Sequence, residues 1–252
     1  MDTIIQILAR ELGRSEAHVE NVVRLIDEGN TIPFIARYRK ELHGAMDDTA
    51  LRTLADRLQY LRNLDKRREE VKSAIEGQGK LTEELSAAID AAATLAEVED
   101  LYRPYRQKRR TRATVAREKG LEPLAELLFA QAADGPAPEE AAGAFIDPEK
   151  GVETAEDALQ GASDIIAERI SDDADIRKRL RELVWKKGYL VSAAAAKEPE
   201  DTVYRLYYAF RSPLNRVQGH QVLAINRGER EGVLKVSVEM EREAALIPVR
   251  RA

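Results

Sequence analysis

The sequence predicts a mostly α-helical protein: a multi-helix array with helix-turn-helix-like elements and a small β element near the C-terminus. Hydrophobic residues recur every three or four positions through most of the first 190 residues, as they do on one face of a helix. Aromatic residues make up only 5% of the 252 residues, whereas leucine and alanine abound, and this composition favours helix over sheet. After residue 190, aromatic and β-branched residues gather and a period-two alternation begins.

The composition is that of a globular protein and excludes several kinds of metal site and covalent cross-link. Charged residues make up 34% and hydrophobic residues 44% of the chain, and the formal net charge is −5. The absence of cysteine excludes disulfides, iron–sulfur clusters and thiolate zinc. No apolar run is long enough for a membrane span, and the first residues lack the basic stretch of a signal peptide. We therefore expect a cytoplasmic protein without a membrane partner.

No motif for catalysis is recognisable in the chain. A Gly-rich phosphate loop, a serine nucleophile elbow and a zincin helix are all absent from the sequence. The three histidines are far apart and lack the spacing of metal ligands. We expect no enzymatic activity, no cofactor and no bound metal.

Two short helices are predicted at the N-terminus. Ile4, Ile5, Leu8 and Leu12 share one helical face that ends at Gly13, and a second helix follows Ser15. Two helices joined by a glycine turn are compatible with a helix-turn-helix, although a small bundle is the commoner arrangement. A tight apolar segment then follows at residues 31–38, in which we expect Ile32, Phe34 and Ile35 to be buried.

The longest periodic run indicates a single long helix. Its apolar face is formed by residues three or four apart, namely Leu51, Leu54, Leu58, Leu61, Leu64, Val71 and Ile75. This stripe is expected to be a core face and spans too few heptads to indicate a coiled-coil dimer. A shorter helix follows Thr82, and Thr94 with Glu97 has the spacing of a capping box for the next helix.

That helix leads into the most unusual stretch of the chain, residues 102–112, which we call the basic segment. No acidic residue occurs between Asp100 and Glu118, and residues 101–117 carry seven arginines and lysines, so the rest of the chain has a net charge of −5 − 7 = −12. Guanidinium groups match phosphate geometry, and tyrosine rings offer faces on which bases stack. Two interpretations stay open: a loop that contacts nucleic acid, and a solvated connector whose tyrosines pack it against a neighbouring helix.

Beyond the basic segment the charge alternates in blocks. Short helices are predicted at residues 114–119 and from Leu121 onward, followed by a linker or mobile loop at residues 132–138. Residues 147–175 hold ten acidic residues against two basic ones. This indicates a solvated acidic helix face, a docking surface for a basic partner, or a surface that repels nucleic acid and keeps it in one groove. Residues 176–187 are basic again, although Lys186 and Lys187 suit the last turn of a helix and need no ligand.

The last sixty residues differ in character. Tyr204, Tyr207, Tyr208 and Phe210 form an aromatic cluster, which we expect in a core more than on a base-stacking surface. On pattern alone, residues 222–225 and 233–238 could form a β-hairpin, because the second run alternates well.

Five stretches of the chain are distinctive: TIPFIARYRKE at 31–41, QGKLT at 78–82, EDLY at 99–102 continued by KRRTRA at 108–113, AREKGLEPL at 116–124 and LAINRGE at 223–229. They resemble the amino-terminal region of Tex, the bacterial transcription-accessory protein family, which is related to a eukaryotic transcription elongation factor. The stretches occur in family order and cover most of the chain; residues 136–152 are the least diagnostic part.

The resemblance carries expectations about fold and organisation. The segment with Leu-Ala-x-x-Arg-Gly is helical in Tex-like proteins, so only the strand at residues 233–238 is predicted. We expect a helical domain at residues 1–130 that contains the basic segment, a helical region with an acidic face at 131–190, and an aromatic and α/β segment at 191–252. Tex-like chains continue into an RNase-H-like domain, helix-hairpin-helix elements and an OB-fold RNA-binding domain. We therefore expect this chain to be an amino-terminal fragment.

The resemblance and the charge pattern together predict a nucleic-acid-binding scaffold of transcription. RNA or DNA is the expected partner, RNA polymerase or other transcription machinery a further one, and the chain is expected to be a monomer. The alternative is a protein-interaction scaffold with little affinity of its own for nucleic acid. The candidate nucleic-acid-binding residues all lie in the basic segment: Arg103, Tyr105, Arg106, Lys108, Arg109, Arg110 and Arg112.

Overall fold

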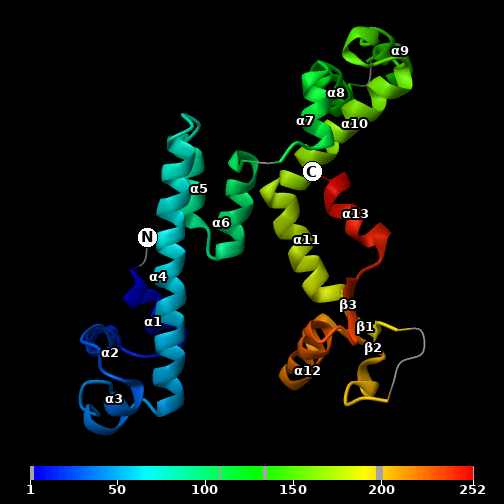
Figure 1. Cartoon of the computed structure of the whole chain (residues 1–252). Coiled ribbons are helices and arrows are strands. Elements are labelled where there is room, and N and C mark those ends of the chain that lie inside the picture. The colour runs from blue at the N-terminus through cyan, green and yellow to red at the C-terminus, as the bar shows by residue number, and fades with distance from the viewer. Residues whose placement is uncertain (1–2, 108, 133–134, 197–200, 252) are drawn as a thin grey trace. The chain divides into compact units, whose positions relative to one another are not determined.

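The computed structural model describes residues 3–107, 109–132, 135–196 and 201–251. These residues form thirteen α-helices, four short 3-10 helices and one three-stranded sheet, which confirms the predicted fold class (Figure 1). The chain divides into two compact units, Met1–Tyr105 and Arg106–Ala252. The predicted domain boundaries at residues 130 and 190 stay predictions.

The first unit is built on one long helix. Its elements in chain order are α1 (Ile4–Leu12), α2 (Glu16–Asp27), α3 (Ile32–Tyr38), α4 (Asp48–Glu76), α5 (Glu83–Ala91), α6 (Leu95–Tyr102) and the 3-10 helix η1 (Arg103–Tyr105). Figure 1 shows α4 as the axis of this unit, with α1 to α3 beside its first half and α5 and α6 beside its second half. Helices α1 and α2 pack on each other and both on α4, so they belong to a bundle; a helix-turn-helix function stays a prediction.

The leucine stripe of α4 is the core of this unit, as predicted. All seven of its apolar positions are buried, from Leu51 to Ile75, and Asp47 caps the helix by accepting a hydrogen bond from the Ala50 amide. In α3, Ile35 is fully buried, whereas Ile32 and Phe34 are only half-buried. A seven-residue helix lying on one side of α4 can turn few of its side chains inward, so the prediction that all three are buried was right for one of them.

Two arginines of α4 fasten the first helices to it from outside the core. Arg57 donates two hydrogen bonds of 2.7 Å to the Glu11 carboxylate, and Arg62 donates two of 2.7 and 2.8 Å to Asp27. These hydrogen bonds lower the pKa of Glu11 and of Asp27 from their ordinary values. The two-point geometry fixes orientation as well as contact.

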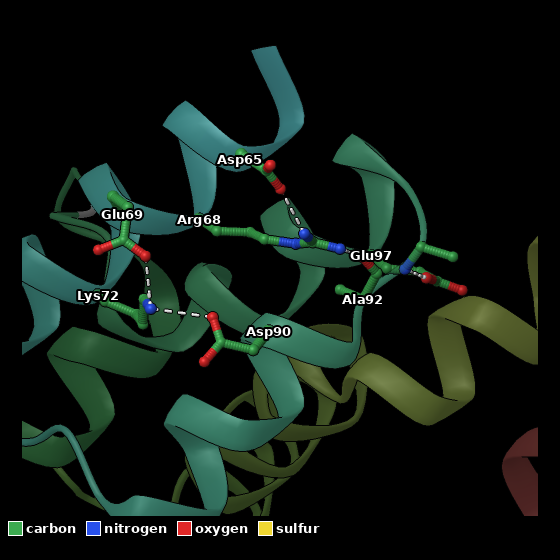
Figure 2. Close-up of polar contacts among 8 residues, drawn as sticks. Asp65, Arg68, Glu69, Lys72, Asp90, Ala92 and Glu97 are labelled. Carbon is green, nitrogen blue, oxygen red and sulfur yellow. Dashed lines mark hydrogen bonds and ion pairs between the residues drawn. The ribbon is translucent and has the colours of Figure 1, made fainter. Parts of the chain in front are cut away.

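A second set of charged groups fastens the α5–α6 pair to α4; we call it the α4–α5 clasp (Figure 2). Lys72 Nζ lies 2.6 Å from Glu69 on its own helix and 2.9 Å from Asp90 on α5. Arg68 lies 2.6 Å from Asp65 and donates a 2.7 Å hydrogen bond to the carbonyl of Ala92, directly after α5. Because Arg68 binds the connection between α5 and α6, the clasp helps to fix the position of α6 on α4. It thereby fixes the point at which the basic segment begins.

The second unit begins with a small-residue helical core. Its helices are α7 (Arg112–Glu118), α8 (Glu122–Ala130), α9 (Pro138–Gly143), η2 (Pro148–Lys150), α10 (Ala155–Asp172) and α11 (Ala174–Lys187). Helix α10 packs on α7, α8 and α9 through buried alanines and Ile165. Of the loop predicted at 132–138, residues 133 and 134 lie outside the described residues, and α9 starts at Pro138.

The sheet follows α11 and is larger than predicted. It is formed by β1 (Tyr189–Ala194), β2 (Ala209–Pro213) and β3 (Leu234–Glu239), antiparallel in the order β2-β1-β3. The remaining elements are η3 (Arg205–Tyr207), η4 (Leu214–Arg216), α12 (Gly219–Arg230) and α13 (Arg242–Arg250). The strand at β3 and the helix at α12 are confirmed. Strands β1 and β2 were missed because each is short and neither shows a clean alternation of apolar and polar residues.

The two faces of the sheet are chemically different. One face carries Ser192 and Leu234, both buried, and Gly228 of α12 approaches Leu234 closely. Tyr204 from the aromatic cluster is buried beside Gly228, as a core role predicts. The other face carries Tyr189 with its cross-strand neighbours Pro213 and Glu239. This second face is polar.

Candidate nucleic-acid interface

The basic segment runs from the end of α6, through η1, to the start of α7. Thr94 caps α6 by accepting a 3.2 Å hydrogen bond from the Glu97 amide. The Glu97 carboxylate, labelled in Figure 2, accepts a 2.7 Å hydrogen bond from the amide of Ala93. Pro104 has no amide hydrogen for the helix ladder, so α6 ends at Tyr102 and the backbone tightens into η1. The boundary between the two units follows directly, between Tyr105 and Arg106.

The two tyrosines of the segment hold it to the first unit. Tyr102 and Tyr105 are half-buried against the core of that unit. The Arg67 guanidinium carbon lies 5.5 Å from the centroid of the Tyr102 ring, and Gln78 Nε2 donates a 2.9 Å hydrogen bond to the carbonyl of Tyr105. These contacts match the packing role left open by the sequence. A stacking role for Tyr105 stays a prediction.

The arginines of the segment are presented to solvent. Arg106, Arg109, Arg110 and Arg112 are exposed, Arg103 is half-buried, and Lys108 lies outside the described residues. Arg110 makes a 2.7 Å ion pair with Glu118, and both side chains remain more than half exposed. Such an exposed pair contributes about 0–1 kcal/mol and exchanges readily with another anion. Four guanidinium groups are therefore exposed within the seven positions from Arg106 to Arg112.

The far end of the segment is fixed to the acidic helix α10. Thr111 caps α7 and also donates a 3.0 Å hydrogen bond to Glu168, whose other oxygen lies 2.7 Å from Arg117. The bond to Glu168 raises the pKa of the Arg117 guanidinium. The contacts with the acidic helix α10 are thus made by Thr111, at the end of the basic segment, and by Arg117 of α7. Both lie close in sequence to the exposed arginines.

Several carboxylates of residues 147–175 have local structural tasks. Asp147 caps η2 and Asp173 caps α11, each by accepting a hydrogen bond from a backbone amide three residues on. Asp157 completes a capping box with Thr154, and these hydrogen bonds lower its pKa. Together with Glu168, these groups stabilise the fold. This assignment favours the interpretation of a structured, solvated face.

A groove lies next to the basic segment, between α7 and α10. Its volume is about 420 Å³, and its lining includes Arg110, Arg112 and Lys119 on one side and Asp157 and Asp164 on the other. Anions are attracted to the arginine edge and repelled by the carboxylate edge. A polyanion would therefore follow the outer edge of α7.

The structure also brings together basic residues that the sequence had set aside. Lys186 and Lys187 at the end of α11 share a cavity with Arg211 of β2 and Arg216 of η4. Sequence reasoning missed this group because it assigned no strand to residues 209–213. Among the described residues, no three or more acidic or histidine side chains gather as metal ligands would, and no helix is both long and apolar enough to cross a membrane.

Comparison with known proteins identifies relatives along almost the whole chain. A family model described as the Tex-like protein N-terminal domain matches residues 2–76, and a model described as Tex central region-like matches residues 134–250. The chain is 46% identical over 239 residues to the protein tex of Bordetella pertussis and 40% identical over 239 residues to the transcriptional accessory protein Tex of Neisseria gonorrhoeae. It is 32% identical over 246 residues to the human S1 RNA-binding domain-containing protein 1.

These alignments cover unequal shares of the proteins compared. Each includes 94% of this chain, but only 30%, 31% and 24% of the three relatives, respectively. The chain therefore spans less than a third of the length of the relatives it matches.

Proposed function

Because the chain belongs to the Tex family, we propose that it is part of a transcription-accessory scaffold that binds RNA or DNA mainly through phosphate contacts. Two relatives support this class of function by name, one as a transcriptional accessory protein and one as a protein with an S1 RNA-binding domain. The proposal assigns no catalytic role to the chain. It places the protein in the cytoplasm, with transcription machinery as a further partner.

The observation that carries the proposal is the exposure of the arginines in the basic segment. Arg106, Arg109, Arg110 and Arg112 are all exposed on a chain that is otherwise strongly acidic. The overall composition of the chain is acidic and does not account for a positive cluster. The electric field of this cluster raises the local concentration of anions around the basic segment. Guanidinium groups bind phosphate oxygens in a two-point geometry that lysine lacks.

The expected binding is largely independent of sequence. Phosphate contacts position a protein on nucleic acid without reading its bases. Tyr102 and Tyr105 are half-buried against the first unit, so most of the affinity is expected from charge. Binding should therefore depend steeply on salt, because each neutralised phosphate releases counterions.

The test is fluorescence anisotropy of the chain with labelled single-stranded RNA and duplex DNA over a range of salt concentrations. If four to six phosphates are contacted, the slope of log affinity against log salt should be about −3 to −5, since each contact contributes about 0.7 to 0.9. A variant with Arg106, Arg109, Arg110 and Arg112 changed to alanine should lose most of this slope. We call it the segment variant.

The matched control removes the same charge from exposed positions outside the basic segment, all in the first unit: Arg14, Arg52, Lys66 and Lys80, each changed to alanine. It should bind within about twofold of the unmodified chain, apart from the small long-range effect that salt screens. Equal losses in both variants would show a nonspecific charge effect and contradict the proposal. No binding by the unmodified chain at low salt would favour the alternative of a protein-interaction scaffold.

A further inference from the structure

A cavity of about 1090 Å³ opens on the polar face of the sheet. The end of α11, the strand β2, η4 and the start of α13 surround it. The amide of Leu214 donates a 3.0 Å hydrogen bond to the carbonyl of Gly188, which joins η4 to the end of α11. Gly188 is required at this point, because a Cβ atom there would lie 3.0 Å from Leu214 Cδ1 and 2.5 Å from the Val184 carbonyl oxygen. We call this cavity the sheet cleft.

The charges that line the sheet cleft are mostly positive. Lys186, Lys187, Arg211 and Arg216 contribute four cations, against the two carboxylates of Glu239 and Glu241. Only Arg211 is partly neutralised, by Glu239 at 3.7 Å across the central strand. No ion pair joins Lys186, Lys187 or Arg216 to another residue that the structure describes. The cleft therefore has a net positive charge and three cations available to an anion.

The helix dipole explains why two lysines lie at the end of α11, but not why two arginines from other elements lie near them. Lysines in the last turn of a helix interact favourably with the carbonyl end, which accounts for Lys186 and Lys187. Arg211 and Arg216 come from other elements, and the antiparallel register places Arg211 beside Val191 on the polar face. Three elements thus direct cations at one concave space, and this arrangement costs electrostatic free energy unless an anion binds there.

An aromatic–guanidinium stack lines the cleft. The Arg211 guanidinium carbon lies 3.6 Å from the centroid of the Tyr189 ring, which is van der Waals stacking distance. The Arg211 side chain is 56% exposed, so the stack leaves much of it open to a ligand. A nucleobase can stack on such a plane while neighbouring cations hold its phosphates.

We propose that the sheet cleft is a second nucleic-acid site, which binds a short stretch of single strand by phosphate contacts to Lys186, Lys187 and Arg216 and by base stacking on Arg211. The ligand class rests on the proposed function, but the residues are separate from the basic segment. A concave site accepts a flexible strand with unpaired bases. A duplex is recognised chiefly by protein elements that project into its grooves, and the cleft offers none.

Trp185 is an optical probe next in sequence to two of the lysines that line the cleft. It is the single tryptophan of the chain, it directly precedes Lys186, and it is 61% exposed. Titration of the chain with single-stranded oligodeoxythymidine should change the Trp185 emission and saturate together with the anisotropy of the labelled strand. A duplex of equal length should bind at least tenfold more weakly by this signal.

Three variants separate the cleft from the basic segment. The cleft variant changes Lys186, Lys187 and Arg216 to alanine and should abolish the Trp185 response while reducing the salt slope by about 2. The segment variant should keep the Trp185 response. A control variant changes three exposed cations of the same unit, Lys150, Arg179 and Arg205, to alanine and should bind within about twofold of the unmodified chain.

The stacking part of the proposal has a test that preserves charge. Arg211→Lys keeps the positive charge but removes the planar group, so single-strand affinity should fall about three- to tenfold with an unchanged salt slope. Thymidine monophosphate serves as a competitor that tests whether the cleft binds a strand or a single nucleotide. If it displaced the oligonucleotide at equal concentration, the site would be a nucleotide pocket and the proposal would be wrong.

The outcomes distinguish this proposal from the proposed function. Loss of the Trp185 response in the cleft variant with retention in the segment variant supports the cleft, whatever the basic segment does. Binding by the cleft variant equal to that of the control overturns the cleft and leaves the basic segment as the site. A complete absence of binding overturns both.

Discussion

Gly161 of α10 shows how one residue can set the distance between two helices. A Cβ atom at this position would overlap Leu121 Cδ1 and would lie 3.3 Å from the Cβ atom of Ala116. Leu121 is 1% exposed and has little room to move. The missing side chain therefore lets α10 lie close to α7, and this contact supports the end of the basic segment.

We predict that Gly161→Ala destabilises the chain by about 1 kcal/mol. Overpacking of a filled core costs about 1–3 kcal/mol, which exceeds the roughly 1 kcal/mol that alanine gains over glycine in a helix. Urea denaturation followed by Trp185 fluorescence measures the difference. Gly143→Ala is the matched control, because Gly143 ends α9 and no atom lies within 4 Å of the added Cβ. A Gly161→Ala variant as stable as this control would contradict the prediction.

Among the elements, the α4–α5 clasp joins two helices through charged side chains at the edge of their shared core. Lys72 is 19% exposed and bridges Glu69 and Asp90, whereas Lys66 on the same helix is 78% exposed and lies 3.8 Å from Glu70. The hydrogen bonds to Glu69 and Asp90 raise the pKa of Lys72 above its ordinary value of 10.5. Its charged form is therefore more stable in the folded chain than in the unfolded one.

We predict that Lys72→Met lowers the free energy of unfolding by about 1 kcal/mol, whereas Lys66→Met changes it by less than about 0.5 kcal/mol. Since the pKa of Lys72 is raised on folding, its contribution is fully present below pH 10.5 and disappears as the pH rises through the folded value. The difference between wild type and Lys72→Met should thus be constant from pH 6 to 9 and shrink above 10.5. Denaturant titrations over this range measure it; a difference that grows with pH would disprove the assignment.

At the scale of the whole molecule, each unit has its own core. Residues 8–98 contribute one buried cluster and residues 113–165 another. The unit boundary between Tyr105 and Arg106 lies inside the basic segment. A loop rich in exposed arginines is a suitable connection, because the free-energy cost of removing its charges from water keeps it out of either core.

We predict that the two cores unfold separately. Leu58→Ala deletes side-chain volume from the first core and should destabilise that unit by about 2–5 kcal/mol. Circular dichroism should then show an early loss of helix, while Trp185 in the second unit reports an unchanged transition. Ile165→Ala should do the reverse. If Leu58→Ala lowered both transitions equally, the chain would unfold as one cooperative body.

The sequence reveals local features because their physical causes are local. The leucine stripe of α4, the cap at Thr94 and the concentration of arginines in the basic segment all follow from spacing and charge along a few turns. The family resemblance identifies α12 as a helix where the pattern alone permits a strand. By itself, then, the sequence determined the fold class, the long helix and the position of the arginine cluster.

The tertiary structure decided what depends on contacts between distant residues. Glu168 meets Arg117 from 51 positions away, and β1 is recognisable as a strand only when β2 and β3 pair with it. The same pairing carries Arg211 and Arg216 to Lys186 and Lys187, which spacing along α11 assigns to an ordinary last turn. Periodicity records which face of an element is buried, but not which other element covers it. For that reason the sequence contained the residues of the sheet cleft and only the fold assembled them.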